Sequence, residues 1–146
     1  MAVKESGLIG RQDKLLTFGQ TGTITSAGTY VCGSDVVLDM FNGDTNPKAT
    51  VAKLDGFSVN FAVDTACAGL TSVVLKVQVC DTSSGTFKDA AVSRSIPLSE
   101  LTANATFKVA VPHGAPSGRY VRAAVVSTGT GTAGVISAAI DTFAGI

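Results

Sequence analysis

Side chains that could carry out covalent catalysis are few, and the best pair lies in one turn-rich stretch. His113, the only histidine of the 146 residues, stands four positions before Ser117. A serine nucleophile needs a histidine base within hydrogen-bond reach and a third group that orients the base. Ser117 lacks the G-x-S-x-G turn of hydrolases, no acidic residue is placed to orient His113, and residues 111–118 contain two prolines and two glycines. We therefore expect a solvated loop histidine, no catalytic residue and no enzymatic activity.

A glycine-rich stretch has the letters of a dinucleotide-binding motif. Residues 129–134 read G-T-G-T-A-G, which matches G-x-G-x-x-G. In that motif a helix begins at the last glycines, so that its N-terminus can meet the pyrophosphate. Residues 135–140 instead alternate as a strand does. The stretch is therefore expected to be a hairpin turn, and no cofactor is expected.

Potential metal ligands do not fall into a recognised spacing. A zinc site needs four ligands, or three and a water molecule, and the three cysteines have no C-x-x-C spacing. The oxygen-bearing side chains of residues 35–46 do not fit the register of an EF-hand loop. We expect no bound metal, and we expect the cysteines to be free thiols that pack as small apolar residues. The residues concerned are Cys32, Cys67 and Cys80, and Asp35, Asp39, Asn42, Asp44 and Asn46.

Composition limits the classes of partner. Charged residues make up 15% of the chain, against roughly 25% in a typical soluble domain. Eleven basic residues balance eleven acidic ones without a Lys/Arg cluster, which argues against nucleic acid as a partner. No apolar run has the length of a membrane span, and residues 1–10 lack the apolar core of a signal peptide, so we expect folding in a cytoplasm. A surface with so little charge suits either a free β-sandwich or a protein that stays bound to a partner.

Alternation of apolar and polar residues predicts strands in the middle of the chain. Residues 57–64 and 73–79 alternate cleanly and are predicted to be half-buried strands. Residues 92–98 are predicted to be an edge strand or a strand end, because Pro97 cannot donate to a central ladder. Residues 98–101 are expected to form at most one helical turn.

Further strands are predicted on both sides of this region. Residues 107–111, 119–127 and 135–141 are expected to form a three-stranded meander, with the middle strand largely buried. Residues 15–25 and 29–41 are expected to form a hairpin about the Ser-Ala-Gly turn between them. About eight strands without an amphipathic helix of useful length favour a two-sheet sandwich or a barrel.

Two segments have no clear periodicity. Residues 1–12 are predicted to be an N-terminal arm whose order depends on docking to a partner, and residues 42–54 to belong to a long loop. Residues 13–146 are then a single β-sandwich domain, which is long enough to bury its own core.

Several of these stretches together resemble the capsid cement proteins, or head decoration proteins, of short-tailed bacteriophages. The most telling is Arg119-Tyr120-Val121-Arg122 after a Pro/Gly turn. The resemblance extends over most of the chain, through residues 13–16 and the Thr-rich segment after them, 73–83, 96–98, 107–112 and the last strand. The chain departs from that pattern in its extra residues before Arg11 and in the region 33–54.

The resemblance implies a fold and a function. It implies an antiparallel two-sheet sandwich of jelly-roll type that decorates the outside of a phage head, does no chemistry and clamps neighbouring subunits of the major capsid protein, often as a homodimer. Such a protein is made and assembled in the bacterial host cytoplasm and ends on the outer surface of the virion. The residues expected in the inter-sheet core are Phe57, Val59, Phe61, Leu75, Val77, Val109 and Tyr120. The candidate contacts with the capsid, in the arm and before the long loop, are Leu8, Ile9, Arg11, Met40 and Phe41.

A carbohydrate-binding or adhesive β-sandwich module is the alternative function. Sugar-binding platforms usually present exposed aromatic rings for stacking. This chain has no tryptophan, and its only tyrosines are Tyr30 and Tyr120. The composition therefore favours the structural role over the sugar-binding one.

Overall fold

The computed structural model describes residues 17–33, 38–39, 57–82, 84–112, 115–116 and 118–140. Within these residues the chain forms ten strands and one 3-10 turn. The elements are β1 (Thr17–Gln20), β2 (Gly28–Val31), β3 (Leu38–Asp39), β4 (Phe57–Ala68), β5 (Ser72–Cys80), β6 (Lys88–Val92), β7 (Ile96–Pro97), η4 (Leu98–Glu100), β8 (Thr106–Val111), β9 (Tyr120–Thr128) and β10 (Ala133–Ile140). Across these ranges, no helix has both the length and the apolar character that a membrane crossing needs.

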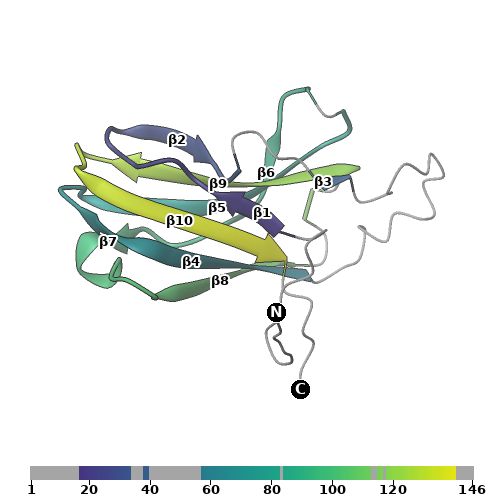
Figure 1. The fold of residues 1–146 in the computed structure, drawn as a ribbon. Coiled ribbons are helices and arrows are strands. Elements are labelled where there is room, and N and C mark those ends of the chain that lie inside the picture. The colour runs from purple at the N-terminus through teal and green to yellow at the C-terminus, as the bar shows by residue number, and fades with distance from the viewer. Residues whose placement is uncertain are drawn as a thin grey trace, which may run out of the picture.

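The strands form two antiparallel sheets that pack face to face (Figure 1). One sheet has the order β1-β10-β4-β8, and the other has the order β2-β9-β5-β6. The short strands β3 and β7 extend the second sheet, because β3 pairs with β9 and β7 with β5. The pairing is nested: β1 joins β10, β2 and β3 join β9, β4 joins β8, and β5 joins β6. A chain folded back on itself in this way and wrapped into two sheets is a jelly roll, so the predicted fold class is confirmed.

Two of the predicted strand pairings are wrong. The expected meander does not form, because β8 and β10 lie in the four-stranded sheet on either side of β4, while β9 lies in the other sheet. The expected hairpin does not form either, since β1 pairs with β10 and β2 pairs with β9. Short connections between alternating strands look the same in sequence whether the chain turns back within one sheet or crosses to the other. Crossing is favoured here because it lets the two apolar faces cover each other.

The glycine-rich segment 129–134 is one of these crossings, and neither the expected hairpin turn nor a dinucleotide-binding loop. It leads into β10, and no helix follows it. Its backbone is bonded to the connection between β1 and β2, because Gly131 N–H donates to Thr25 O at 3.0 Å, and to the last residue of β4, because Thr132 N–H donates to Ala68 O at 2.9 Å. The crossing therefore ties these two segments together at this end of the core.

The core lies between the sheets and consists of alternate residues from each long strand. Burying a side chain of the size of valine, leucine or phenylalanine stabilises the fold by about 1.5–3 kcal/mol. Of the seven residues predicted for this core, Val59, Phe61, Leu75, Val77 and Val109 are buried in it, and Phe57 is half-buried and packs against it.

Tyr120 is the exception, and its prediction as a core residue is wrong. Val121 and Ala123 on β9 are buried in the core. Because side chains alternate along a strand, Tyr120 and Arg122 belong to the outer face. Tyr120 is half-buried there, with the guanidinium of Arg119 5.2 Å from the centre of its ring.

The two predictions for residues 92–101 are confirmed. β6 and β7 pair only with β5, at the edge of their sheet, and Pro97 lies in β7 opposite Ser72. The helical turn is the 3-10 turn η4, which Leu101 N–H closes by donating to Leu98 O at 3.0 Å.

Candidate interaction surfaces

Most of the residues singled out for chemistry or docking in the sequence lie outside the described residues. These are His113 and Ser117, the arm with Leu8, Ile9 and Arg11, the pair Met40 and Phe41, and the acidic and amide residues of 35–46 except Asp39, which lies in β3. In the part of the chain that the structure describes, no group of three or more His, Cys, Asp or Glu side chains could hold a metal ion.

The three cysteines lie apart, as free thiols in different environments. Cys32 is fully buried, and burial, with a smaller effect from Asp64, raises the pKa of its thiol to about 12. Burial also raises the pKa of Cys67, which is half-buried. Cys80 is 9% exposed, and hydrogen bonds with Thr82, chiefly from its backbone N–H, lower the pKa of this thiol. The expectation of small buried residues is confirmed for Cys32 and Cys80, whereas Cys67 is only half-buried.

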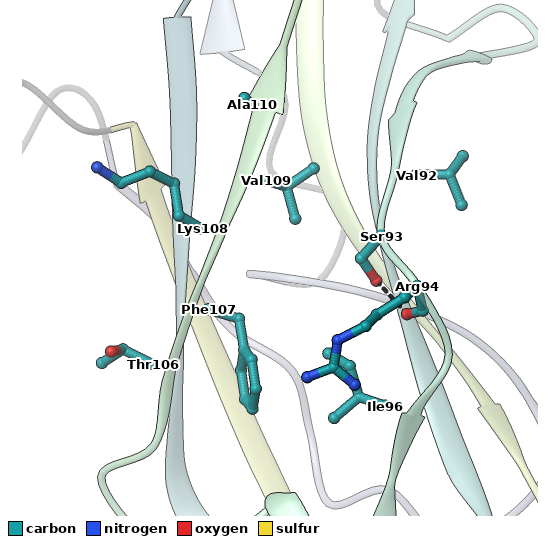
Figure 2. Close-up of a pocket in the computed structure, with 9 residues that line it drawn as sticks. All are labelled: Val92, Ser93, Arg94, Ile96, Thr106, Phe107, Lys108, Val109 and Ala110. Carbon is teal, nitrogen blue, oxygen red and sulfur yellow. Dashed lines mark hydrogen bonds between the residues drawn. The ribbon is translucent and has the colours of Figure 1, made fainter.

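A groove of about 400 Å³ lies between the edges of the two sheets. Ile96 and Val109 are buried, and Phe107 is half-buried. Val92, at one rim, is 51% exposed and is the only exposed large apolar side chain in the described ranges. Figure 2 shows the lining residues, with Phe107 on β8 facing Arg94 and Ile96 on the other side. They are Val92, Ser93, Arg94, Ile96, Thr106, Phe107, Lys108, Val109 and Ala110.

The polar groups of the groove have structural partners. Ser93 Oγ accepts the N–H of Leu75 at 2.9 Å and donates to Arg94 O at 2.7 Å, so its hydroxyl fills the break between β6 and β7. The guanidinium of Arg94 is paired with the carboxylate of Glu100. Among the described residues that line the groove, there is neither a histidine nor a carboxylate. The lining of the groove is thus mixed, with Val92 and Phe107 beside hydroxyl and cationic side chains.

A connected row of polar side chains, which we call the polar ladder, crosses the outer face of the six-stranded sheet. It consists of Arg122 on β9, Gln78 and Lys76 on β5, and Asp89 on β6. Arg122 Nε donates to Gln78 Oε1 at 2.9 Å, and Gln78 Nε2 donates to Asp89 Oδ1 at 2.9 Å. Lys76 Nζ lies 3.0 Å from the other carboxylate oxygen of Asp89. The guanidinium carbon of Arg122 is 4.3 Å from the centre of the Phe87 ring.

Strand register brings the ladder together. Gln78 is paired with Arg122 on one side and with Asp89 on the other, so all three side chains leave the sheet on the same face. Gln78 is only 9% exposed, and both ends of its amide are bonded, which fixes the amide in one orientation. The hydrogen bond from the Gln78 amide and, to a smaller extent, the contact with Lys76 lower the pKa of Asp89. This carboxylate therefore stays ionised at pH values at which an ordinary aspartate begins to take up a proton.

The outer face of the four-stranded sheet carries several small side chains. Ser137 is paired with Ala62, and Ala139 with Asn60, which is paired on its other side with Lys108. The carboxylate of Asp64 accepts hydrogen bonds from Gln20 at 2.7 Å and from Ser137 at 3.2 Å. Small side chains lose little conformational entropy when a surface is covered, so the entropy cost of covering them is low.

The polar ladder and the groove were missed in the sequence because each is assembled across strands. Gln78 and Arg122 are 44 positions apart, and Gln78 and Asp89 are 11 apart. One signal was present: Lys76 and Gln78 interrupt an apolar run at alternate positions, as Arg122 does in its own run. When two central strands are neighbours in a sheet and both carry polar residues on the same face, these residues are predicted to form a row.

Comparison with known families identifies the chain. The family model Bbp16 matches residues 19–140, which extend from β1 to the end of β10. The chain therefore belongs to the Bbp16 family, and the name of this family is associated with bacteriophages. No curated protein matches the chain.

Proposed function

We propose that this member of the Bbp16 family is a capsid cement protein, which binds the outer surface of a tailed-phage head and clamps neighbouring subunits of the major capsid protein. The observation that carries the proposal is the extent of the family match. It covers nearly the whole jelly roll. The unit shared with a phage-associated family is thus the sandwich itself, and the sandwich is the part that must cover the seam between shell subunits.

The surface of the sandwich supports this function. The described faces offer a patch of small side chains and an ordered polar row. A protein–protein interface of standard size buries about 1,600 Å² in total, with an apolar centre and a polar rim. Clamping increases the area buried across a seam, and symmetric repetition over the shell, with homodimers that hold two seams, multiplies a modest affinity at each site.

Occupancy of purified heads that lack this protein tests the proposal. The full chain is mixed with the heads, unbound protein is removed by sedimentation, and genome release is followed during heating. We expect saturable binding and release at a higher temperature. A heat-unfolded sample of the same chain controls for nonspecific adsorption. If the folded protein does not bind the heads, or binds without delaying release, this function is wrong.

The contribution of the N-terminal arm is tested in the same assay. The arm is proposed to add contacts beyond the sandwich, through Leu8, Ile9 and Arg11. The chain that lacks residues 1–10 should then bind with lower occupancy. Equal occupancy and equal protection of the genome would show that the sandwich faces alone form the clamp.

The sugar-binding alternative is less well supported by the described aromatic residues. The ring of Tyr30 packs against the core, and its hydroxyl accepts the backbone N–H of Thr25 and of Ser26, at 3.2 and 3.1 Å. Neither Tyr30 nor Tyr120 lines the groove. Specific binding on a glycan array would favour the alternative.

A further inference from the structure

The polar ladder holds one arginine in a fixed orientation on the outer face of the six-stranded sheet. Arg122 is anchored twice, because its Nε donates to Gln78 Oε1 at 2.9 Å and its guanidinium lies over the ring of Phe87. Gln78 is itself held by Asp89. A surface arginine normally loses rotamer entropy when it binds a partner. Here most of that entropy is already lost in the free protein.

The hydrogen bond to Gln78 uses only one of the donors of Arg122. A guanidinium has five N–H groups, one on Nε and four on the two terminal nitrogens. Among the described residues, Nε is the only atom of this side chain that makes a hydrogen bond. Arg122 is half-buried, so part of the residue remains accessible to solvent. The two terminal nitrogens of Arg122 can contact a partner group end-on while the side chain stays stacked on Phe87 and bonded to Gln78.

The charge of the polar ladder favours an anionic partner group. The ladder has two cations, Lys76 and Arg122, and one carboxylate, Asp89, which is bound by Lys76 and Gln78. Farther along this sheet, Asp81 is exposed after the end of β5, and β3 places Asp39 opposite Tyr120, so the excess of positive charge belongs to the ladder and not to the whole face.

We propose that Arg122 is a docking residue that binds a carboxylate side chain of a protein partner through its two terminal nitrogens. A planar guanidinium matches the two oxygens of a carboxylate, and arginine is enriched among the residues that dominate binding energy at interfaces. Nucleic acid is disfavoured as the source of the anion, because the chain has no cluster of basic residues. The identity of the partner as the capsid shell rests on the proposed function, whereas the recognition of a carboxylate does not.

A titration of the intact protein tests the recognition directly. The probe is an N-acetylated tetraglutamate peptide, with inorganic phosphate as the comparison, and the readout is the side-chain nitrogen NMR signals of the arginines. We expect the peptide to shift the Arg122 signals saturably and to leave the Arg94 signals unchanged, since Arg94 is already paired with Glu100. The proposal is overturned if the Arg122 signals do not move, or if phosphate shifts them and the peptide does not.

Binding to purified heads then tests the docking role. Arg122→Gln removes the charge and the terminal donors, Arg122→Lys keeps the charge without the planar fork, and Arg94→Gln is the matched control, taken from the groove in Figure 2. We expect Arg122→Gln to weaken binding about ten- to a hundredfold, Arg122→Lys to be intermediate, and Arg94→Gln to bind nearly as the original chain does.

The two assays separate the two proposals. If the original chain does not bind heads but the peptide still shifts Arg122, the cement function fails and carboxylate recognition stands. If heads are bound equally by the original chain and by Arg122→Gln, or if Arg94→Gln loses as much affinity, Arg122 is not a docking residue. Thermal unfolding of each variant separates a loss of binding from a loss of fold, because a purely structural Arg122 would lower the unfolding temperature without changing the binding of the fraction that remains folded.

Discussion

Replacing Gly131 by alanine is expected to destabilise the sandwich through a clash in the crossing between β9 and β10. A β-carbon here would lie 2.5 Å from Ile24 O and 2.6 Å from Cδ2 of Leu70, whereas ordinary contacts fall between 3.4 and 4 Å. Leu70 can rotate its side chain, but Ile24 O belongs to the backbone. The two segments would have to separate by about 0.9 Å, the difference between 2.5 and 3.4 Å.

Hydrogen bonds oppose that separation. Gly131 N–H donates to Thr25 O at 3.0 Å, and Ile24 N–H donates to Gly134 O at 2.9 Å, so both segments are bonded on each side of the clash. Overpacking of a well-packed site costs about 1–3 kcal/mol. Alanine also reduces the entropy of the unfolded chain, which stabilises the protein by about 0.4–1 kcal/mol wherever the native backbone accepts it.

Gly22→Ala is the matched control. It lies in the connection between β1 and β2, and a β-carbon there would meet nothing within 4 Å. Both substitutions have the same effect on the unfolded chain, so the difference in unfolding free energy between the two variants isolates the clash, at about 1–3 kcal/mol. Urea unfolding with an unchanged slope measures this difference. If the two variants are equally stable, the crossing is not closely packed and the reasoning is wrong.

Two further predictions concern titration. Hydrogen bonds from Ser26, chiefly from its side chain, lower the pKa of Tyr30 to about 8. An ultraviolet titration should therefore show one tyrosine ionising near pH 8, and Tyr30→Phe should remove that step. If the first tyrosine ionises near pH 10 instead, the prediction is wrong. Burial raises the pKa of Cys32 to about 12, so this thiol should resist thiol reagents until the protein unfolds. Because its pKa is higher in the folded protein than in the unfolded chain, its contribution to stability should be complete below about pH 8.5 and should be lost as the pH rises toward 12. Mass-spectrometric mapping of the labelled cysteines checks this, and labelling of Cys32 in the folded protein before Cys67 would refute it.

The strands could be predicted from the sequence, but most of their partners could not. Alternation is a local property, so residues 57–64 and 73–79 predicted β4 and β5 within a few residues. Pairing is not local: β1 meets β10 across more than a hundred positions of the chain, and β2 meets β9 across more than ninety. The turn signals at 26–28 and 129–134 mark where the chain changes direction, and they do not say whether it stays in the same sheet. Tyr120 was misplaced because a strand that is apolar on both faces does not indicate which face is inward.

The surfaces could be predicted even less, because a site built from cross-strand pairs depends on register. Gln78 meets Arg122 and Asp89 only once β5 is placed between β9 and β6. A shift of one residue would turn the polar side chains toward the core. A motif that is continuous in sequence, such as residues 129–134, can be seen without knowing the register, whereas the polar ladder cannot.

The edges of the sandwich give a reason for docking through its faces. An exposed edge strand can pair with another chain, and this hazard grows when many copies are held close together, as they would be on a shell. Most of the described edges are short or irregular: β1 has four residues and a register shift, β6 has five residues and a register shift, and β7 contains Pro97. The other edge of the four-stranded sheet, β8, has six residues in regular register with β4 and carries the charged side chain of Lys108, which disfavours pairing with another strand. Such edges are poor templates for strand addition between neighbouring copies. Side chains on the faces are then the better means of specific contact, and the polar ladder is a row of such side chains whose orientation is already fixed in the free protein.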